Sequence, residues 1–297
     1  MKKIFSSMLL LTFLITALFP TGAFAYESPD TTRTNDKKMV QKFNEYDLIK
    51  KLKSSDKKNL YIQGYTDLQV QEIAKLDYKK EIEKRGTLDT DVLGNMGYTD
   101  EQITIMKNFT GTEKELYLLS ATLTLNCYYD TSNYAGATTT YKVNFDWNWS
   151  SEPYYEHKDI IGLGWTEQLY INISSSYHKV TYINPYVPTD TKLISYKFST
   201  TLGNSTAESK FPMLISGSKP DESDAKYAKD GFGSVTLFRQ SKVTMMAIKF
   251  KYGHTQSSIE PSLSIGIPFS VGVGFGFASH ISDEATSPAD GVYYYLK

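Results

Sequence analysis

The densest cluster of side chains that could do chemistry follows a tryptophan-rich segment. It joins three carboxylates and a histidine to two tyrosines: Glu152, Tyr154, Tyr155, Glu156, His157 and Asp159. Paired carboxylates beside aromatic rings can hydrolyse a glycosidic bond, because one acid donates a proton while the other stabilises or attacks the sugar. That chemistry requires two of the three carboxyl groups to converge in a cleft, about 5 to 9.5 Å apart.

The same side chains could bind a ligand without changing it. Together with Trp147 and Trp149, which precede them, they could hold a sugar or another protein by ring stacking and hydrogen bonding. A loop of this composition can also be plain solvated surface. All three interpretations remain open from the sequence.

Other catalytic chemistry has little support in the sequence. Cys127, the only cysteine, falls on the apolar side of an alternating segment, which predicts a buried and unreactive thiol. The four histidines show no close pairing of the kind that marks a zinc site. No serine lies in a Gly-x-Ser-x-Gly motif, and the glycines at 272–276 lead to no helix that could bind phosphate. We therefore expect no catalytic residue, no metal ligand and no cofactor.

A second candidate surface is the alternating segment from 263 to 277. Its odd-numbered positions are apolar, and its even-numbered positions are Ser, Gly or Pro. Such alternation suits a membrane-inserting hairpin with one face to lipid and one to water. The alternative is core strands, bent at Pro268, whose glycines allow a neighbouring layer to approach. The side chains that would contact a membrane or partner are Ile265, Ile267, Phe269, Val271, Val273 and Phe275.

Strands are the elements that must carry most of these residues. Apolar residues recur at every second position at 123–127, 141–149, 169–173 and 246–252. Repeated strands with polar connections and no helical period predict a mainly antiparallel β-sandwich over 117–297, with a barrel as the nearest rival. The longest run places five large side chains on one face: Tyr141, Val143, Phe145, Trp147 and Trp149.

Residues 41–116 are more densely charged and predict a small helical region. The segment GYTDLQV at 64–70 recurs as GYTDEQI at 97–103. In both copies a threonine can cap a helix start, and a glutamine three residues later completes a capping box. We expect a pair of helical hairpins that support the following domain, so the predicted fold class is α+β.

The first 25 residues have the layout of a secretory signal peptide. Lys2 and Lys3 precede an apolar stretch, and the Ala-Phe-Ala sequence at 23–25 suits cleavage after Ala25. Residues 26–40 are polar and predict a flexible tether. The chain is thus expected to be secreted, with one cysteine and no internal disulfide.

The charge balance argues against nucleic acid as a partner. The whole chain carries 32 Lys and Arg against 33 Asp and Glu, and loss of the two leader lysines shifts the formal net charge from -1 to about -3. A nucleic-acid-binding protein usually carries a basic surface. We therefore expect the partner to be an extracellular ligand, either carbohydrate or another protein.

Several short motifs resemble a group of uncharacterised secreted proteins of Gram-positive bacteria. They are GYTDEQI at 97–103, SATLT at 120–124, FDWNWS at 145–150, FPM at 211–213 and YGH at 252–254. The resemblance implies a secreted β-domain. Because that group has no known activity, it transfers no catalytic residues.

Taken together, these features predict a secreted non-enzymatic binding or interaction module of unknown ligand. The first alternative is a membrane-active, toxin-like β-protein that uses the segment at 263–277. The second alternative is an enzyme similar to a glycoside hydrolase that uses the carboxylates at 152–159.

Overall fold

The computed structural model describes residues 39–62, 65–154, 157–201, 205–215 and 224–255. It also describes four short pieces, at 263–264, 276–277, 281–286 and 292–295. All of them fall in one compact unit, Thr34–Lys297. The predicted signal peptide and most of the predicted tether lie outside the described residues.

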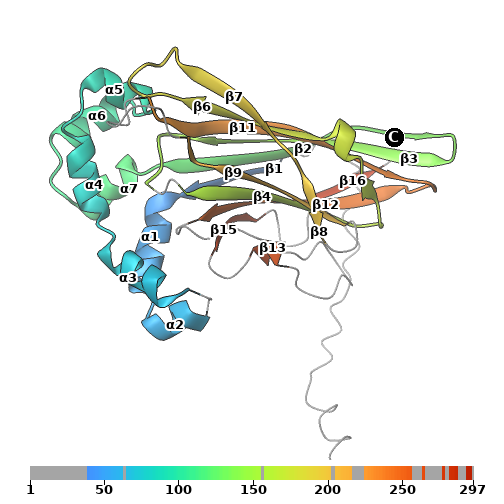
Figure 1. Cartoon of the computed structure of the whole chain (residues 1–297), viewed down its shortest axis with the longest axis horizontal. Helices are drawn as coiled ribbons and strands as arrows, with labels where there is room; N and C mark the ends of the chain where they lie inside the picture. Colours follow the sequence, from blue (N-terminus) through green and yellow to red (C-terminus); the bar gives the residue numbers. More distant parts are fainter. Residues whose placement is uncertain are drawn as a thin grey trace, which may run out of the picture. The chain divides into compact units, whose positions relative to one another are not determined.

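Two antiparallel sheets form the body of this unit (Figure 1). The first has the order β1-β2-β3-β11-β6-β7, with β5 and β10 also paired to β11, and the second has the order β15-β12-β4-β9-β8, with β16 also paired to β12. The first sheet comprises β1 (Met39–Asn44), β2 (Thr122–Ala135), β3 (Thr138–Trp149), β5 (Tyr170–Ile171), β6 (Tyr177–Ile183), β7 (Thr191–Tyr196), β10 (Leu214–Ile215) and β11 (Lys226–Arg239). The second comprises β4 (Lys158–Trp165), β8 (Ser199–Thr201), β9 (Thr206–Pro212), β12 (Met245–Thr255), β15 (Ile281–Thr286) and β16 (Val292–Tyr295). The predicted fold class is confirmed.

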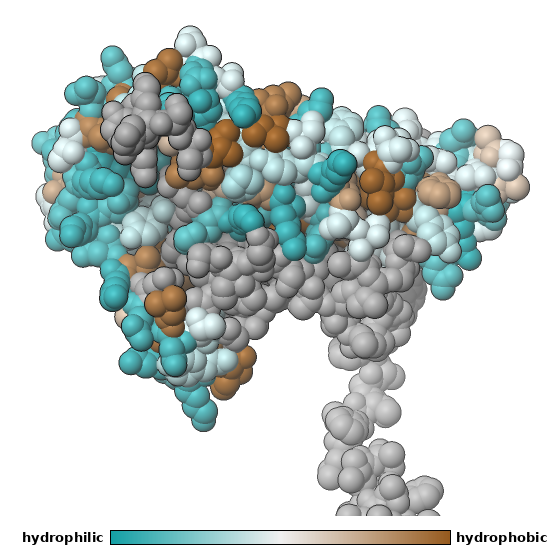
Figure 2. Space-filling view, in the orientation of Figure 1, coloured by the Kyte–Doolittle hydropathy of each residue, from teal (hydrophilic) through white to brown (hydrophobic). Residues whose placement is uncertain are grey.

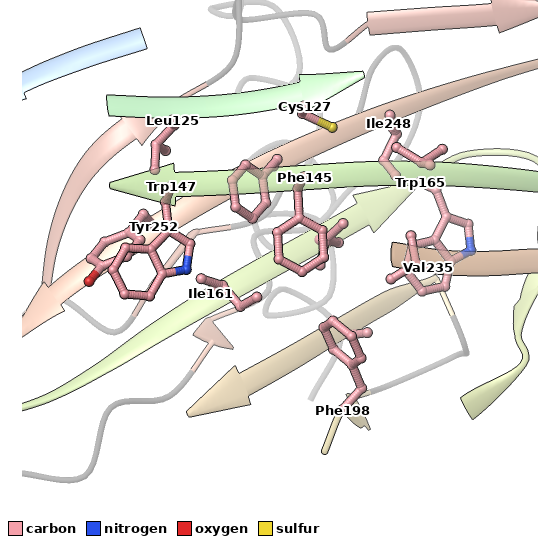
Figure 3. Packing of buried hydrophobic residues seen from close by; sticks show 14 of the residues in the cluster. Leu125, Cys127, Phe145, Trp147, Ile161, Trp165, Phe198, Val235, Ile248 and Tyr252 are labelled. Carbon is pink, nitrogen blue, oxygen red and sulfur yellow. The ribbon is translucent and has the colours of Figure 1, made fainter. Parts of the chain in front are cut away.

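The two sheets enclose an aromatic core. Along β3 the odd-numbered side chains from Tyr141 to Trp149 are buried, while the even-numbered ones from Lys142 to Asn148 stay partly exposed. This is the period of two that the sequence predicts. Figure 3 shows Phe145 and Trp147 from the first sheet pointing toward Ile161 and Tyr252 from the second.

Two glycines of β11 make room for these rings. A Cβ atom on Gly231 would lie 2.6 Å from the Trp147 ring, and one on Gly233 would lie 2.3 Å from the Phe145 ring. Both glycines pair directly with those aromatic residues in the register of β3 and β11. The missing side chains on β11 therefore let the large rings of β3 cover the neighbouring strand.

Seven helices lie between β1 and β2 in the described part of the chain. They surround a separate apolar core that includes Ile49, Ile82 and Leu93. None of the described helices is both long and apolar enough to cross a membrane. They are α1 (Glu45–Ser54), α2 (Lys57–Ile62), α3 (Asp67–Lys75), α4 (Tyr78–Arg85), α5 (Thr90–Asn95), α6 (Asp100–Lys107) and α7 (Glu113–Leu119).

The second copy of the repeated motif forms the predicted capping box. The Thr99 side chain accepts from the Gln102 backbone N–H, and the Gln102 side chain accepts from the Thr99 backbone N–H. In the first copy, Thr66 directly precedes α3, and its carbonyl accepts from Val70 N–H at 2.9 Å. Both copies therefore lie at helix starts.

Two local expectations need correction. The strand β1 spans the predicted boundary between tether and helices, and it pairs antiparallel with β2 at the edge of the first sheet. Six residues are too few to show a clear period in a charged region. The predicted strand at 169–173 reduces to β5 and a 3-10 turn at Ile173–Ser175, because Asn172 accepts bonds from the hydroxyls of Ser174 and Ser176 and so favours a turn.

Candidate functional site

Trp147 and Trp149 face the interior of the sandwich. Their side chains are almost fully buried. The ring N–H of Trp147 donates to Nε2 of His178, and that of Trp149 donates to the Tyr252 hydroxyl, both at 3.2 Å. Neither ring can stack on an external ligand, which corrects the expectation that these tryptophans bind one.

Asp159 also lies in the core, on β4. Its Oδ2 accepts a hydrogen bond from the Tyr252 hydroxyl at 2.7 Å and lies 2.8 Å from Nδ1 of His254. A carboxyl group with no exposed surface cannot act on a sugar in an open cleft. Asp159 therefore does not pair with Glu152 as glycoside hydrolysis would require, and the expectation that it contacts a ligand is corrected.

His254 lies between two carboxylates. Its Nδ1 faces Asp159, and its Nε2 lies 3.4 Å from Oε1 of Glu45 at the start of α1. Burial lowers the pKa of His254, but the charges and hydrogen bonds of the two carboxylates outweigh that effect and raise it to about 10. The ring is therefore an imidazolium at neutral pH, with each nitrogen facing one carboxylate.

Glu45 extends this network to the loop after β3. Its two carboxylate oxygens accept from the backbone N–H of Tyr154, at 2.7 and 2.9 Å. Glu45 has no exposed surface. One carboxylate thus connects the first turn of α1, the ring of His254 on β12 and the loop that contains the predicted site.

Arg85, the last residue of α4, holds the same loop from the other side. Its Nη1 donates to the carbonyl of Glu152 at 2.7 Å and to the Tyr98 hydroxyl at 2.8 Å, and its Nη2 donates to the carbonyl of Pro153 at 3.2 Å. Its Nε donates to Glu81 at 3.0 Å. A guanidinium has five N–H donors in a rigid fork, and Arg85 gives two of them to carbonyls of the loop backbone.

A pocket of ≈ 560 Å³ lies between α4 and this loop. Of the predicted cluster, Glu152 and Tyr154 line it. Tyr154 also packs on Tyr78 of α4, with ring centroids 5.6 Å apart. The other lining residues come from the helices and from the connections near β6, β10 and β11: Glu81, Lys84, Arg85, Leu88, Met96, Pro185, Tyr186, Leu214, Ala225 and Tyr227.

Glu152, which lines the pocket, has one carboxylate oxygen without a hydrogen bond in the described part of the chain. Its Oε2 is buried and has no hydrogen-bond partner among the described residues. The nearby Lys229 donates instead to the carbonyl of Ser150, at 2.7 Å. Burial lowers the pKa of Lys229 to about 8, although the charges of Asp230 and Glu152 act in the opposite direction. Lys229 therefore attracts Glu152 through its charge but gives its hydrogen bond to the Ser150 carbonyl.

The outer face of the first sheet carries exposed aromatic side chains. Phe232 and Tyr177 are each about two-fifths exposed and meet edge to face, with centroids 6.4 Å apart. Lys179 lies over the Tyr177 ring, and Asn126 donates to the Asp146 carboxylate. Figure 2 shows the helical end as mainly hydrophilic, with apolar side chains gathered in small patches over the strands.

Several predicted residues are not brought to the pocket. His157 is exposed, and its carbonyl accepts from Met213 N–H at 2.7 Å. Cys127 is confirmed as a buried core thiol. Within the described residues, no group of His, Cys, Asp and Glu could hold a metal ion. Tyr155 and Glu156 lie outside the described residues.

The proposed membrane or partner surface also lies outside the described residues. This applies to Ile265, Ile267, Phe269, Val271, Val273 and Phe275. The two ends of that segment are described: β13 (Leu263–Ser264) pairs antiparallel with β14 (Gly276–Phe277). Antiparallel pairing is the relation between the two arms of a hairpin. Membrane contact by the residues between these ends stays a prediction.

The sequence-based prediction did not identify the residues that hold the pocket together. Arg85 follows Tyr78 and Ile82 at the spacing of one helix face, and both of those residues are buried. An arginine on an apolar helix face is the signal that could have identified it. Glu45 carries no such signal, because its partners lie 109 and 209 residues away.

These features define a two-sheet antiparallel sandwich with a helical block and a preformed polar pocket. No protein-family model matches the chain. No curated protein sequence matches it either.

Among solved structures, similarity is found to domains of bacterial surface proteins and to a toxin. The collagen-binding subdomain of the Enterococcus faecalis surface protein ACE is 9% identical with a TM-score of 0.27, over 58% of this chain and 95% of that one. A Staphylococcus aureus adhesin's collagen-binding domain is 11% identical with a TM-score of 0.24, over 44% and 88%. Clostridium perfringens delta-toxin is 9% identical with a TM-score of 0.23, over 48% and 74%. Similarity this distant does not bear on function.

Proposed function

We propose that this protein is a binding module that holds its ligand in the pocket between α4 and the loop after β3. Its volume falls within the range of about 300 to 1,000 Å³ that is typical of small-ligand sites. Its lining combines aromatic and apolar side chains with a few charged groups, which is the usual composition of such sites. Secretion after cleavage at Ala25 would place this module outside the cell.

The observation that carries the proposal is the rigid wall formed by Arg85. Four hydrogen bonds tie this side chain to α4, to Tyr98 and to two carbonyls of the loop. Glu45 holds the next residue of the loop through the Tyr154 N–H. A site whose backbone is fixed before the ligand arrives loses less entropy on binding.

The arrangement favours binding over hydrolysis. In the pocket, Glu81 is already paired with Arg85, which leaves Glu152 without a second uncommitted carboxylate opposite it among the described lining residues. Asp159 is buried in the core, where it contacts Tyr252 and His254. A retaining or inverting glycosidase requires two carboxyl groups that flank one bond.

The test is a ligand screen with a blocked pocket. Ala225 lines the pocket, so Ala225→Trp should fill it and abolish binding of any compound that raises the melting temperature of the wild-type protein. Ala135, exposed at the end of β2, provides the matched control Ala135→Trp. Titration calorimetry with amino acids, amines, oligosaccharides and peptides measures the affinities.

We expect the control to bind like the wild type and the blocked variant to bind at least tenfold more weakly. Equal affinities in the wild type and Ala225→Trp would place the ligand elsewhere. A panel in which no compound binds would contradict the proposal.

A further inference from the structure

We infer that the pocket selects ligands that carry an ammonium or guanidinium group, and that Glu152 is the residue that holds this group. The inference rests on the proposed binding function. It starts from the Oε2 atom of Glu152, which is buried and has no hydrogen-bond partner among the described residues. A buried carboxylate oxygen without a donor is unfavourable, and a ligand N–H would satisfy it once the Glu152 side chain turns toward the pocket.

The neighbouring cations do not fill this role. Arg85 gives its donors to Glu81, Tyr98 and the backbone of the loop, including the carbonyl but not the carboxylate of Glu152. Lys229 donates to the carbonyl of Ser150. The carboxylate of Glu152 therefore lies among cations that are committed to other acceptors.

Lys84 is the remaining cation among the described lining residues. It lies in the last turn of α4 and is exposed to solvent, so its charge is well hydrated and screened by salt. An anionic ligand would depend on this one lysine and on the one donor of Arg85 that has no assigned acceptor. The charge pattern therefore favours a cationic ligand group over an anionic one.

The aromatic lining suits a cation as well. Tyr154, Tyr186 and Tyr227 contribute rings to the pocket, and the face of a tyrosine ring attracts an ammonium or guanidinium group. The Tyr227 hydroxyl already donates to the Met96 carbonyl at 3.2 Å. Its ring is thus held in place, while the half-exposed Tyr186 forms part of the rim.

The pocket is larger than a bare ammonium ion. A volume of ≈ 560 Å³ leaves space for an apolar chain beside Leu88, Met96 and Leu214. The favoured ligand is therefore a cation on an aliphatic stem. A free alkylamine and a lysine or arginine side chain of a polypeptide share this chemistry, and the experiment separates the two sources.

The experiment compares cationic, neutral and anionic probes against the full mature chain by titration calorimetry at two salt concentrations. N-acetyl-lysine amide carries the ammonium, N-acetyl-norleucine amide is its neutral counterpart, and hexanoate is the anionic probe. Pentylamine represents the free amine, and a lysine-containing hexapeptide with its norleucine analogue represents the polypeptide source. We expect the lysine probes to bind at least tenfold more tightly than their neutral counterparts.

Glu152→Gln tests the role of the carboxylate. We expect it to reduce the affinity for the ammonium probes at least tenfold and to leave the affinity for the neutral probes unchanged. Glu83→Gln removes an equal charge from an exposed position on α4 that does not line the pocket, and it should bind like the wild type. Because the charge of Glu152 also attracts Arg85 and Lys229, the ligand-free Glu152→Gln protein should melt at a slightly lower temperature, so the binding experiments are run well below that temperature.

The outcomes distinguish failure of the cation inference from failure of the proposed binding function. Equal binding of the neutral probes, or tighter binding of hexanoate, would overturn the cation inference while the pocket stands. The same holds if no probe binds but another compound binds and is blocked in Ala225→Trp. Glu83→Gln losing as much affinity as Glu152→Gln would reduce the effect to general attraction by an acidic protein.

Discussion

At the scale of single residues, two buried histidines of the sandwich differ in charge at neutral pH: His178 is neutral and His254 is a cation. Burial lowers the pKa of His178 to about 3. Its Nε2 accepts the Trp147 ring N–H, and Nδ1 lies 3.0 Å from the Ser209 hydroxyl, which fits a neutral ring with its proton on Nδ1. His254 is held between Asp159 and Glu45 and stays protonated.

The two histidines should make the free energy of unfolding depend on pH in opposite directions. Below about pH 6.5 both the folded and unfolded chains carry the His254 proton; as the pH rises toward 10 only the unfolded chain releases it, so the free energy of unfolding falls. For His178, the ring takes up a proton below about pH 6.5 in the unfolded chain, whereas in the folded chain it stays neutral down to about pH 3. The free energy of unfolding therefore falls on acidification.

Urea unfolding across this pH range measures both effects as differences from variants. His254→Gln should remove the alkaline limb and, by leaving two buried carboxylates uncompensated, lower the free energy of unfolding near neutral pH by about 3 to 5 kcal/mol. His178→Gln should remove only its acid contribution. Subtraction of each variant's curve from the wild-type curve cancels the titration of Lys229 and of the surface carboxylates, and parallel curves would contradict the assignment.

At the scale of elements, the glycines of β11 decide whether the aromatic strand β3 fits. Gly233→Ala should lower the free energy of unfolding by about 1 to 3 kcal/mol, because the new Cβ atom would overlap the Phe145 ring and the Tyr177 carbonyl. Gly94 of α5 has no atom within 4 Å of the position of an added Cβ. Gly94→Ala should therefore stabilise the helix by about 0.5 to 1 kcal/mol, and equal effects of the two variants in urea unfolding would refute the packing argument.

The elements that could be predicted from the sequence are those whose signal is local. The strand β3 shows its period of two over twelve residues, and the helix start at Thr99 shows both members of its capping box. The strand β1 could not be predicted this way, because its partner β2 lies beyond all seven described helices. Short strands depend on their neighbours more than on their own residues.

At the scale of the whole unit, two apolar cores are joined by charged side chains. The helical core and the sandwich core share Phe43 at their margins. Arg85 and Glu45 connect the helices to the loop at 152–154. The candidate site lies at this junction. The sequence indicated Glu152 and Tyr154, but it did not indicate Arg85 and Glu45, because their hydrogen bonds to the loop join residues that lie far apart along the chain.

We expect the two cores to unfold together. All three tryptophans lie in the sandwich core, so fluorescence reports that core, whereas circular dichroism at the helical band reports mainly the helices. Arg85→Ala should lower the free energy of unfolding by about 3 to 5 kcal/mol, because it leaves buried acceptors unpaired. It should also move the dichroism midpoint to lower urea than the fluorescence midpoint, because the hydrogen bonds between α4 and the loop are lost.

The exposed pair of Lys50 and Glu113 provides the control for this prediction. Lys50→Ala breaks a surface ion pair and should cost no more than about 1 kcal/mol without separating the two midpoints. Separate midpoints in the wild-type protein would show that the junction does not couple the cores.

The pairing of β1 with β2 has a topological meaning. Asn44 and Thr122 face each other in the same ladder, so the seven described helices between them are, in the connectivity of the sheet, one very long hairpin loop. A designer could shorten this loop to a tight turn and still close the ladder, but the shortened chain would lose Glu45 and Arg85. The helical block is thus an insertion between two paired strands, and the pocket requires residues from that insertion.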